Sequence, residues 1–434
     1  MPAKQYNFFR VQSLIPALLA GGNWNNGANC SSQSRNANNA RSNANSNYGG
    51  QGQRHGGGHL TPRLDTVPCW KPKGRRQNTQ RRDYPVSSVS ESGTVRKNMR
   101  RHGHLWKKIV SEENILAAFQ KAAKGKSNKL NVQKFKLNLE ANLQNIRQSL
   151  IDKTFRTATY FEKEIYEPKK RTIYVLPFFN RIVHHALLLV LGPIWEALFI
   201  KDSYASREGK GIHSGSNRAM EFVRRNKYCL KCDVSKFYPS IDHEILMNII
   251  RRKIKDPDTL WLIDEIIHSY PGGKNTPIGN YTSQWFGNLY LNELDQYVKN
   301  TLRVKDYIRY CDDFILFSDD KKFLRQCADA IEIFLAEKLK LKLSKCELFP
   351  VKQGVDFLGY RHFDNYILLR KSTTKRVRKR LERLPKLYAG GKITAEQYRS
   401  SVGSTWGWLK HANTHNLVVA IQFRKLFNEV KKIV

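Results

Sequence analysis

The stretch YIRYCDDFILFSDD, residues 307–320, decides the fold, because two apolar runs flank two adjacent acids. Residues 307–310 and 314–317 have the composition of short strands, and the polar break between them fits a tight hairpin turn. Asp312 and Asp313 would then lie together at the tip of the hairpin. Two like charges side by side in a partly buried position repel each other. We therefore expect a positive group at this tip.

The composition indicates a partner that carries many negative charges. The 434 residues include 75 Lys and Arg against 37 Asp and Glu, which gives a formal net charge of +38. Nucleic acid is the commonest polyanion partner. A lysine-rich solvated surface and a membrane surface are the alternatives. No apolar run approaches the ~20 residues of a membrane span, and we expect nucleic acid, not a membrane, as the partner.

The seven cysteines are an odd number spread along a long chain. This usage favours reduced thiols in a cytoplasmic protein over a disulfide framework. Cys229 and Cys232 form a lone C-x-x-C pair, whereas a zinc site would need a second pair or histidines at ligand spacing. Residues three apart on a strand also point to opposite faces. We therefore expect no metal at these two cysteines.

Residues 1–98 are predicted to be a disordered, Asn-rich and basic extension. Residues 21–50 contain ten Asn and no apolar periodicity, and residues 61–110 contain 13 Lys or Arg against 3 acids. Asn, Ser and Gly favour turns, and such a composition does not support a packed core. The pattern predicts that order begins near Met99.

From residue 99 onward the patterns predict an α+β chain. Helices are expected within residues 104–126, 130–150 and 180–199, and a β-hairpin within 155–177. A strand ending at Asp233 follows, then helices over 242–254 and 283–303, the opening hairpin, a helix over 321–343 and a strand over 346–351. This is a split β-α-β-β-α-β unit with one extra helix. Residues 361–434 are helical and basic, with 17 Lys or Arg against 4 acids.

The first strand of such a sheet can lie beside the central hairpin. Asp233 would then sit next to Asp312 and Asp313, about eighty residues away in the chain. Carboxylates gathered at one point bind hard divalent cations. Two Mg²⁺ ions about 4 Å apart, with Mn²⁺ as a substitute, would form a clamp for nucleotidyl transfer. The alternative is a solvent-exposed acidic turn, which Asp-Asp alone would favour.

Several motifs in chain order resemble those of reverse transcriptases. Tyr310 to Asp313 is similar to their Y-x-D-D motif, DVSKFYPSID from Asp233 to their first catalytic motif, and GVDFLGY at 354–360 to their primer grip. RTIYVLPFFNRIVHHALL at 171–188 and SYASREGKGIHSG at 203–215 resemble the fingers of the bacterial branch that includes group II intron and retron enzymes. The resemblance implies a right-hand polymerase with N-terminal helices and fingers in 99–225, a catalytic palm in 226–360 and a basic helical thumb in 361–434.

One variant motif narrows the resemblance. In PIGNYTSQWFGNLYLNELD, residues 277–295, this chain has Ile278-Gly279 and Ser283-Gln284 where most relatives have Gln-Gly and Ser-Pro. This variant, with GWLKHANTHNL at 407–417, resembles the reverse transcriptases of diversity-generating retroelements. The resemblance implies an RNA-directed DNA polymerase that copies a template-repeat RNA into cDNA with adenine-specific infidelity, for mutagenic retrohoming. Its partners would be template RNA, a primer or cDNA, dNTPs and a small basic accessory variability protein.

The resemblance also implies roles for individual residues. Asp233 and Asp312 would be the main metal ligands, and Asp313 the third acid. Tyr238 matches the aromatic residue that blocks a ribose 2′-hydroxyl, with a core aromatic as the alternative. Lys345 would protonate the leaving pyrophosphate.

Five further residues are assigned to the nucleotide pocket. Arg171 and Arg207 are candidates for the triphosphate, because guanidinium forks match phosphate oxygens, and each could equally be a surface charge. Gly279 would let backbone approach the base pair, because no Cβ intrudes. Ile278 and Gln284 belong to the same pocket.

Other interpretations remain open. The N-A-x-x-H and V-T-G patterns of retron enzymes are not evident, and group II intron proteins usually continue past the thumb, whereas this chain stops at Val434. An RNA-binding relative without polymerase activity is the alternative from another class. The Asn-rich segment resembles a template repeat translated in frame, so we expect the native polymerase to start at Met99. An Asn-rich tail that binds RNA is the alternative.

Overall fold

The computed structural model describes residues 101–166 and 170–432, which all belong to one compact unit. The predicted extension at residues 1–98 lies outside the described residues. The central element of the described part is a four-stranded antiparallel sheet in the order β4-β5-β3-β6. Its strands are β3 (Tyr228–Val234), β4 (Asp306–Tyr310), β5 (Asp313–Ser318) and β6 (Leu343–Pro350).

Helices precede the sheet and connect its strands. The N-terminal elements are α1 (Trp106–Ile109), α2 (Glu112–Ala123), α3 (Leu130–Leu137), α4 (Leu139–Ile151), β1 (Phe161–Ile165), β2 (Arg171–Val175), α5 (Phe178–Glu196) and α6 (Ile212–Arg225). The connecting helices are α7 (Phe237–Ser240), α8 (His243–Arg251), α9 (Pro257–His268), α10 (Tyr281–Gln296), the π-helical turn η2 (Tyr297–Thr301) and α11 (Lys321–Leu339). The sheet therefore has the predicted β-α-β-β-α-β order. Between β3 and β4, however, the chain forms five helical elements where two helices were predicted.

Two predicted helices are each divided in the structure. The helix expected within 104–126 becomes α1 and α2, and Ser111 starts α2 by accepting a hydrogen bond from the backbone N–H of Asn114 at 3.3 Å. The helix expected over 130–150 breaks at Asn138, whose φ of −127° is not helical. The helix expected to reach residue 343 ends at Leu339, because Lys340 adopts a left-handed backbone with φ 50°. The hairpin expected within 155–177 is present as β1 and β2.

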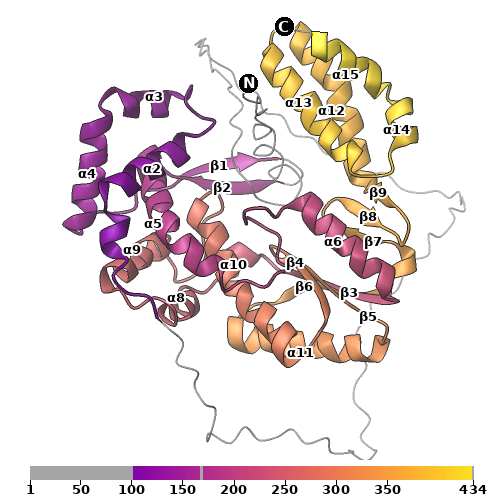
Figure 1. The fold of residues 1–434 in the computed structure, drawn as a ribbon, viewed down its shortest axis with the longest axis horizontal. Helices are drawn as coiled ribbons and strands as arrows, with labels where there is room; N and C mark the ends of the chain where they lie inside the picture. The colour runs from indigo at the N-terminus through magenta and orange to yellow at the C-terminus, as the bar shows by residue number, and fades with distance from the viewer. Residues whose placement is uncertain (1–100, 167–169, 433–434) are drawn as a thin grey trace, which may run out of the picture. The chain divides into compact units, whose positions relative to one another are not determined.

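Side chains of the sheet alternate between two hydrophobic clusters. Leu230, Cys232 and Phe314 pack in the cluster that contains α11 residues, and Cys229 and Ile315 pack in the cluster that contains α6 residues. Helices α11 and α6 lie on opposite sides of the sheet in Figure 1. The expected opposite orientation of Cys229 and Cys232 is confirmed.

Helix α5 is long and apolar enough to cross a membrane by length and composition, so the expectation that no apolar run approaches this length was wrong. The helix packs inside the described unit. Leu187, Leu191 and Trp195 have no exposed surface and belong to the larger cluster. Packing in the core accounts for the apolar character of α5, as is common for the core helix of a globular unit.

A smaller sheet and a helical segment complete the chain. They comprise η3 (Val351–Gln353), β7 (Val355–Phe357), β8 (Tyr360–His362), β9 (Ile367–Leu369), α12 (Lys371–Ala389), α13 (Ala395–Lys410), α14 (His415–Ala420) and α15 (Phe423–Lys432). The sheet contacts α6, because the Ser216 hydroxyl lies 2.7 Å from Nε2 of His362. The same hydroxyl lies 2.9 Å from Nε2 of His411, which follows α13. The predicted domain boundary after residue 360 falls inside β8.

Candidate active site

The three acids singled out in the sequence meet at one end of the four-stranded sheet. Tyr310 pairs with Asp313 across the β4–β5 hairpin, which leaves Cys311 and Asp312 as a two-residue turn. Asp233 on β3 pairs directly with Asp313. The backbone N–H of Val234 donates to the carbonyl of Asp312 at 3.2 Å. Directly paired residues share a face of the sheet, so Asp233 and Asp313 point to the same side, next to the turn that carries Asp312.

The charge of these acids is only partly offset by the protein. Burial, and then the charge of Asp233, raises the pKa of Asp312 to about 6. Burial also raises the pKa of Asp313 to about 7, although the Lys231 ammonium opposes this rise. Nζ of Lys231 lies 3.3 Å from Oδ2 of Asp313, whereas Oδ1 of Asp313 is buried without a hydrogen-bond partner. This unpaired oxygen and the raised pKa values are what a site that accepts a cation would have.

The donor set fits Mg²⁺ held together with a substrate. Among residues 101–166 and 170–432, no three His, Cys, Asp or Glu side chains form a ready-made metal group. Mg²⁺ usually takes one or two protein carboxylates and completes its shell with waters and substrate phosphates. Asp233 and Asp312 supply two partly exposed carboxylates in this manner.

Two residues of β6 flank Asp233 from the other side. The Ser344 hydroxyl donates to Oδ2 of Asp233 at 2.5 Å, and Lys345 is the residue paired directly with Asp233. Lys345 is exposed and shares the face of Asp233. Lys345 was predicted from the resemblance, whereas Ser344 was not, because its contact with Asp233 depends on the register between β3 and β6.

The buried ion pair of Arg309 with Asp295 supports the turn formed by Cys311 and Asp312. Arg309 has no exposed side-chain surface, and its guanidinium donates to the carboxylate of Asp295 at 2.7 and 2.5 Å. The same guanidinium donates to the carbonyl of Cys311 at 3.1 Å, and the Tyr307 hydroxyl donates to Asp295 at 2.7 Å. These contacts tie the hairpin to α10. The signal in the sequence was an arginine inside an otherwise apolar strand.

Tyr238 stands beside the turn. Burial, with the neighbouring Cys311 and Asp312, raises its pKa well above the usual value, and its side chain shares a hydrogen bond with Cys311. A Cβ at Gly287 of α10 would lie 3.2 Å from the ring, so the glycine leaves room for it. The ring therefore lies next to the turn that carries Asp312.

The segment before α10 contacts β2. The backbone N–H of Tyr174 donates to the carbonyl of Ile278 at 2.8 Å, and a Cβ on Gly279 would lie 2.6 Å from the carbonyl oxygen of Tyr174. Gly279 has φ +122°, so this approach needs a glycine. Arg171 on β2 is close enough to Asp312 to lower its pKa. Gln284 follows in the first turn of α10 and is partly exposed.

Arg207 does not share this environment. Its side chain is 6% exposed, and it bonds to the Glu196 carboxylate at 2.7 and 2.8 Å. It also donates to the carbonyls of Ile200 at 2.6 Å and Ser203 at 2.9 Å. The guanidinium anchors the chain after α5, so the geometry does not support the role predicted for it with the triphosphate.

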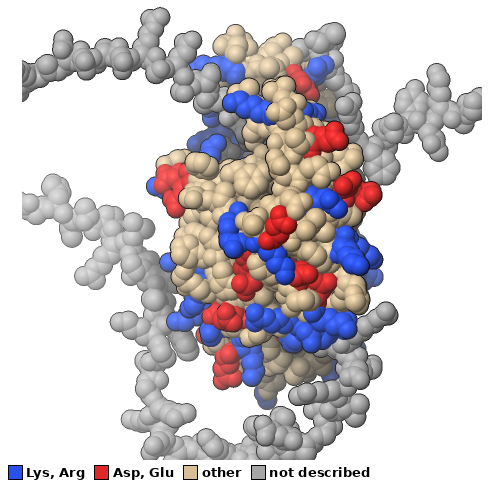
Figure 2. All heavy atoms as spheres, turned by 90° about the vertical axis from the view of Figure 1, so that its left-hand side faces the viewer, with Lys and Arg blue, Asp and Glu red and all other residues tan. Residues whose placement is uncertain are grey.

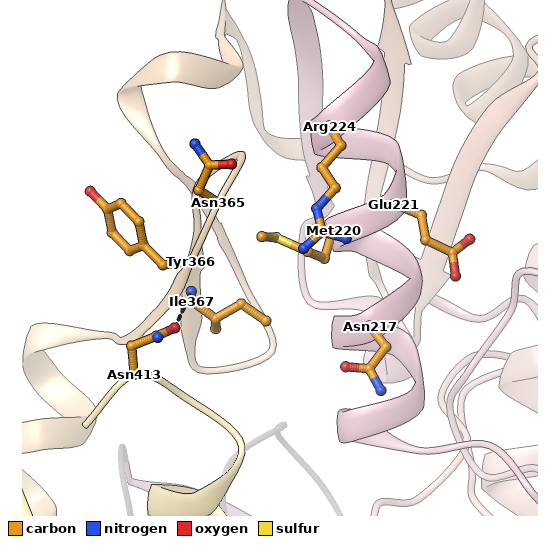
Figure 3. A pocket seen from close by; sticks show the side chains of 8 residues that line it. All are labelled: Asn217, Met220, Glu221, Arg224, Asn365, Tyr366, Ile367 and Asn413. Atoms are coloured by element: carbon orange, nitrogen blue, oxygen red, sulfur yellow. Dashed lines mark hydrogen bonds between the residues drawn. The ribbon is translucent and has the colours of Figure 1, made fainter. Parts of the chain in front are cut away.

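Two other surface features bear on ligands. A pocket of about 320 Å³ lies between α6, the β8–β9 turn and the segment that joins α13 to α14, and none of the predicted site residues lines it (Figure 3). On the face seen in Figure 2, Lys and Arg are mixed with Asp and Glu. By contrast, the exposed charged residues of α12 follow one helical stripe and include one acid, Glu382. The basic members are Lys371, Lys375, Arg378, Lys379, Arg383 and Lys386.

Residues 162–362, which include all three acids, match the family model described as reverse transcriptase (RNA-dependent DNA polymerase). Protein YkfC of Escherichia coli K12 is 26% identical over 280 residues, which cover 51% of this chain and 71% of that protein. The group II intron-encoded protein LtrA of Lactococcus lactis is 22% identical over 302 residues, 51% of this chain and 49% of LtrA. The retron Ec73 reverse transcriptase of Escherichia coli is 28% identical over 203 residues, 42% of this chain and 63% of that enzyme.

Proposed function

We propose that the chain is an RNA-directed DNA polymerase that copies RNA into DNA at Asp233, Asp312 and Asp313, because residues 162–362 match the reverse transcriptase family model and the relatives named above include a retron reverse transcriptase. The observation that carries this proposal is the direct pairing of Asp233 with Asp313 beside the Asp312 turn. In this proposal residues 99–225 contain the fingers, 226–360 the palm and 361–434 the thumb.

Two Mg²⁺ ions, with Mn²⁺ as a substitute, would be held by Asp233 and Asp312, with Asp313 as the third acid. When bound, such ions activate the primer 3′-hydroxyl and stabilise the leaving pyrophosphate. The chain contributes the position of the carboxylates. Ser344 fixes one oxygen of Asp233, and Lys231 offsets the charge of Asp313.

The nucleotide would bind between β2, α7 and the start of α10. Tyr238 would exclude a ribose 2′-hydroxyl and so select dNTPs. Arg171, whose charge lowers the pKa of Asp312, and Lys345, which pairs directly with Asp233, would supply charge-assisted hydrogen bonds to the triphosphate and pyrophosphate. Ile278, Gly279 and Gln284 would line the pocket for the base pair.

A primer-extension assay tests the polymerase proposal. The purified chain is given an RNA template, a DNA primer, Mg²⁺ and either dNTPs or rNTPs. We expect dNTP incorporation that stops when the cation is chelated, and we expect Tyr238→Ala to admit rNTPs. Tyr238→Phe is the matched control, because it keeps the ring. A folded chain that binds the template but incorporates no dNTP under any of these conditions would refute the proposal.

We further propose that this polymerase belongs to the branch of diversity-generating retroelements. The support is the Ile278-Gly279 and Ser283-Gln284 variant at the nucleotide pocket. An aliphatic Ile278 cannot donate or accept a hydrogen bond where a glutamine could. One such contact is worth about 1 kcal/mol, or several-fold in selectivity. In this proposal the enzyme copies a template-repeat RNA with errors at adenines, for mutagenic retrohoming.

Sequencing of cDNA tests whether the polymerase belongs to this branch. The cDNA is copied from a matching template-repeat RNA, with and without any accessory protein encoded beside the polymerase. We expect errors concentrated at template adenines, and fewer of them in Ile278→Gln. Errors spread evenly over the four template bases would favour the alternatives, a retron or group II intron-type enzyme, and would leave the polymerase proposal intact.

The proposal includes a cellular setting. Template RNA, primer and dNTPs are the substrates that the domain class implies, and the net charge of +38 suits the two nucleic acids. We propose a small basic accessory protein as a partner and a cytoplasmic location. Pull-down from cells that express the whole locus, followed by mass spectrometry, tests the partner.

A further inference from the structure

Two cysteines face each other across the sheet next to the proposed active site. Cys232 on β3 pairs directly with Cys346 on β6, and their sulfur atoms are 3.3 Å apart. Cys232 is fully buried, whereas Cys346 is exposed on β6, which is an edge strand. The pair suggested by the sequence spacing, Cys229 and Cys232, is on opposite faces, so the actual partner of Cys232 lies more than a hundred residues away.

We infer that Cys232 and Cys346 are a redox-sensitive thiol pair, which a peroxide converts into a disulfide that slows the enzyme. A disulfide requires two Cβ atoms about 3.5–4.5 Å apart, and directly paired residues in neighbouring strands have Cβ atoms about 4.5–5.5 Å apart. The sulfur separation must fall from 3.3 Å to the ~2.05 Å of an S–S bond. A movement of about 1 Å between β3 and β6 therefore closes the bond.

The chemistry balances with hydrogen peroxide as the oxidant. The exposed sulfur of Cys346 attacks one peroxide oxygen, the O–O bond breaks, and Cys346 becomes a sulfenic acid with release of one water. The thiol of Cys232 then attacks that sulfur, the S–O bond breaks, and a second water leaves. Two thiols lose two electrons and two protons in all. A dithiol such as dithiothreitol reverses the change by becoming a cyclic disulfide itself.

The position of the pair links oxidation to the active site. Asp233 follows Cys232 on β3, and Ser344 and Lys345 precede Cys346 on β6. The hydrogen bond from Ser344 to Asp233, at 2.5 Å, spans the same two strands. Misplacing reacting groups by about 1 Å can cost ~100-fold in rate. We expect at least about tenfold slower extension in the oxidised chain. This effect rests on the proposed function, whereas formation of the disulfide does not.

The other described cysteines provide controls. Cys327 is buried on α11 and Cys229 is buried on the opposite face of β3, and neither has a sulfur partner in the described part of the chain. Cys311 is partly exposed in the Asp312 turn, so its oxidation is the competing explanation for lost activity. Cys346→Ser separates the two explanations, because it removes the exposed sulfur of the pair and leaves Cys311 in place.

The experiment treats the purified full chain with hydrogen peroxide, blocks free thiols with an alkylating agent in denaturant so that buried thiols also react, and maps linked peptides by mass spectrometry. Extension is measured before oxidation, after oxidation and after dithiothreitol. We expect a Cys232–Cys346 linked peptide, at least about tenfold slower extension, and recovery with dithiothreitol. Cys346→Ser should extend like the unmodified chain and keep its activity in peroxide, as should Cys346→Ala. Cys327→Ser should remain sensitive.

Three results would overturn the inference. One is that Cys232 and Cys346 both stay alkylatable while peroxide oxidises Cys311. Another is a linkage of Cys346 to a cysteine other than Cys232. The third is equal inhibition of Cys346→Ser and the unmodified chain. A linked peptide in a chain that never extends a primer would refute the proposed function instead, so the two failures are distinguishable.

Discussion

At the scale of single residues, the carboxyl groups at the hairpin tip carry charge that the protein compensates only in part. The pKa of Asp312 is raised to about 6 and that of Asp313 to about 7, chiefly by burial. In an unfolded chain both groups would ionise near pH 4. Ionising them in the folded chain therefore costs stability, and this cost is absent below pH 4 and complete above the raised pKa values.

We predict that Asp312→Asn stabilises the metal-free protein at pH 8 while it abolishes activity. The asparagine carries no charge to bury, so the free energy of unfolding should rise by about 3 kcal/mol at pH 8, and by much less at pH 4, where the folded aspartate is itself protonated. Urea unfolding of both proteins at the two pH values, with a chelator present, measures this. An asparagine variant that is less stable than the parent at pH 8 would contradict this account of the site.

Lys231 is a positioning residue that joins the site to the smaller sheet. Its ammonium lies 3.3 Å from Asp313 and donates to the carbonyl of Asp356 on β7 at 2.5 Å. Removing it leaves the partly buried carboxylate of Asp313 without its positive neighbour, which favours the protonated form.

We predict that Lys231→Met slows extension about tenfold. The pH of half-maximal extension should also move upward, since the pKa of Asp313 would rise further. Lys231→Arg should restore part of the rate. Lys227→Met, which changes an exposed lysine just before β3, is the control. A pH profile that is unchanged in Lys231→Met would remove the lysine from this role.

The residues that sequence alone could predict are those inside short contiguous motifs. Asp233, Asp312, Asp313 and Tyr238 each stand at a fixed spacing from a recognisable strand or turn. Ser344 could not be found in this way, because it is defined by the register between β3 and β6. Arg207 shows the converse, since a motif position does not reveal that Glu196 and two carbonyls occupy its guanidinium.

At the scale of elements, periodicity identified several of the longest helices, but it missed the helices α6 and α9 as well as the short strands β7, β8 and β9. Helices α5, α10 and α11 have apolar faces long enough to be seen in the sequence. Strands β7, β8 and β9 have three residues each, which is below the length at which alternation is readable. The break between α3 and α4 comes from a non-helical backbone conformation at Asn138. The apolar pattern of the sequence does not indicate this break.

Helix α12 is the element best suited to hold a nucleic-acid backbone. Its exposed basic residues recur at helical spacing on one face. We predict that changing Lys375, Arg378 and Lys379 together to glutamine weakens RNA binding and lowers the slope of log affinity against log salt by about 2 to 3. Binding is measured by fluorescence anisotropy at several salt concentrations.

Exposed lysines of α11 provide the matched control for this helix. Changing Lys321, Lys322 and Lys338 to glutamine removes the same amount of charge from another surface. This variant should keep the slope of the unmodified chain. Equal slopes for the two triple variants would mean that the net charge of the molecule, and not α12, sets binding.

At the scale of the whole described unit, the two hydrophobic clusters hold the site between them. The cluster with α11 fixes the sheet from one side, and the cluster with α6 joins the sheet to β7–β9 and the C-terminal helices. Ser216 of α6 bridges His362 of β8 and His411 after α13. Burial holds the pKa of both histidines near 4, so this junction is uncharged at neutral pH. Packed elements therefore connect the sheet that carries the carboxylates to the basic helix α12.

The central claim is that the carboxylates act in the chemical step and not in holding RNA. Primer extension and RNA binding measured on the same preparations of the unmodified chain, Asp233→Ala and Asp312→Ala test it most directly. Asp329→Ala, which removes an exposed carboxylate from α11, is the control.

We predict that each site variant loses extension by at least ~1,000-fold, since misplaced metal ions cost several kcal/mol. RNA affinity should stay within about twofold of the unmodified chain, because Mg²⁺-binding carboxylates make no phosphate contact of their own. Asp329→Ala should behave like the unmodified chain in both measurements. Extension by Asp312→Ala at the rate of the unmodified chain would contradict the account.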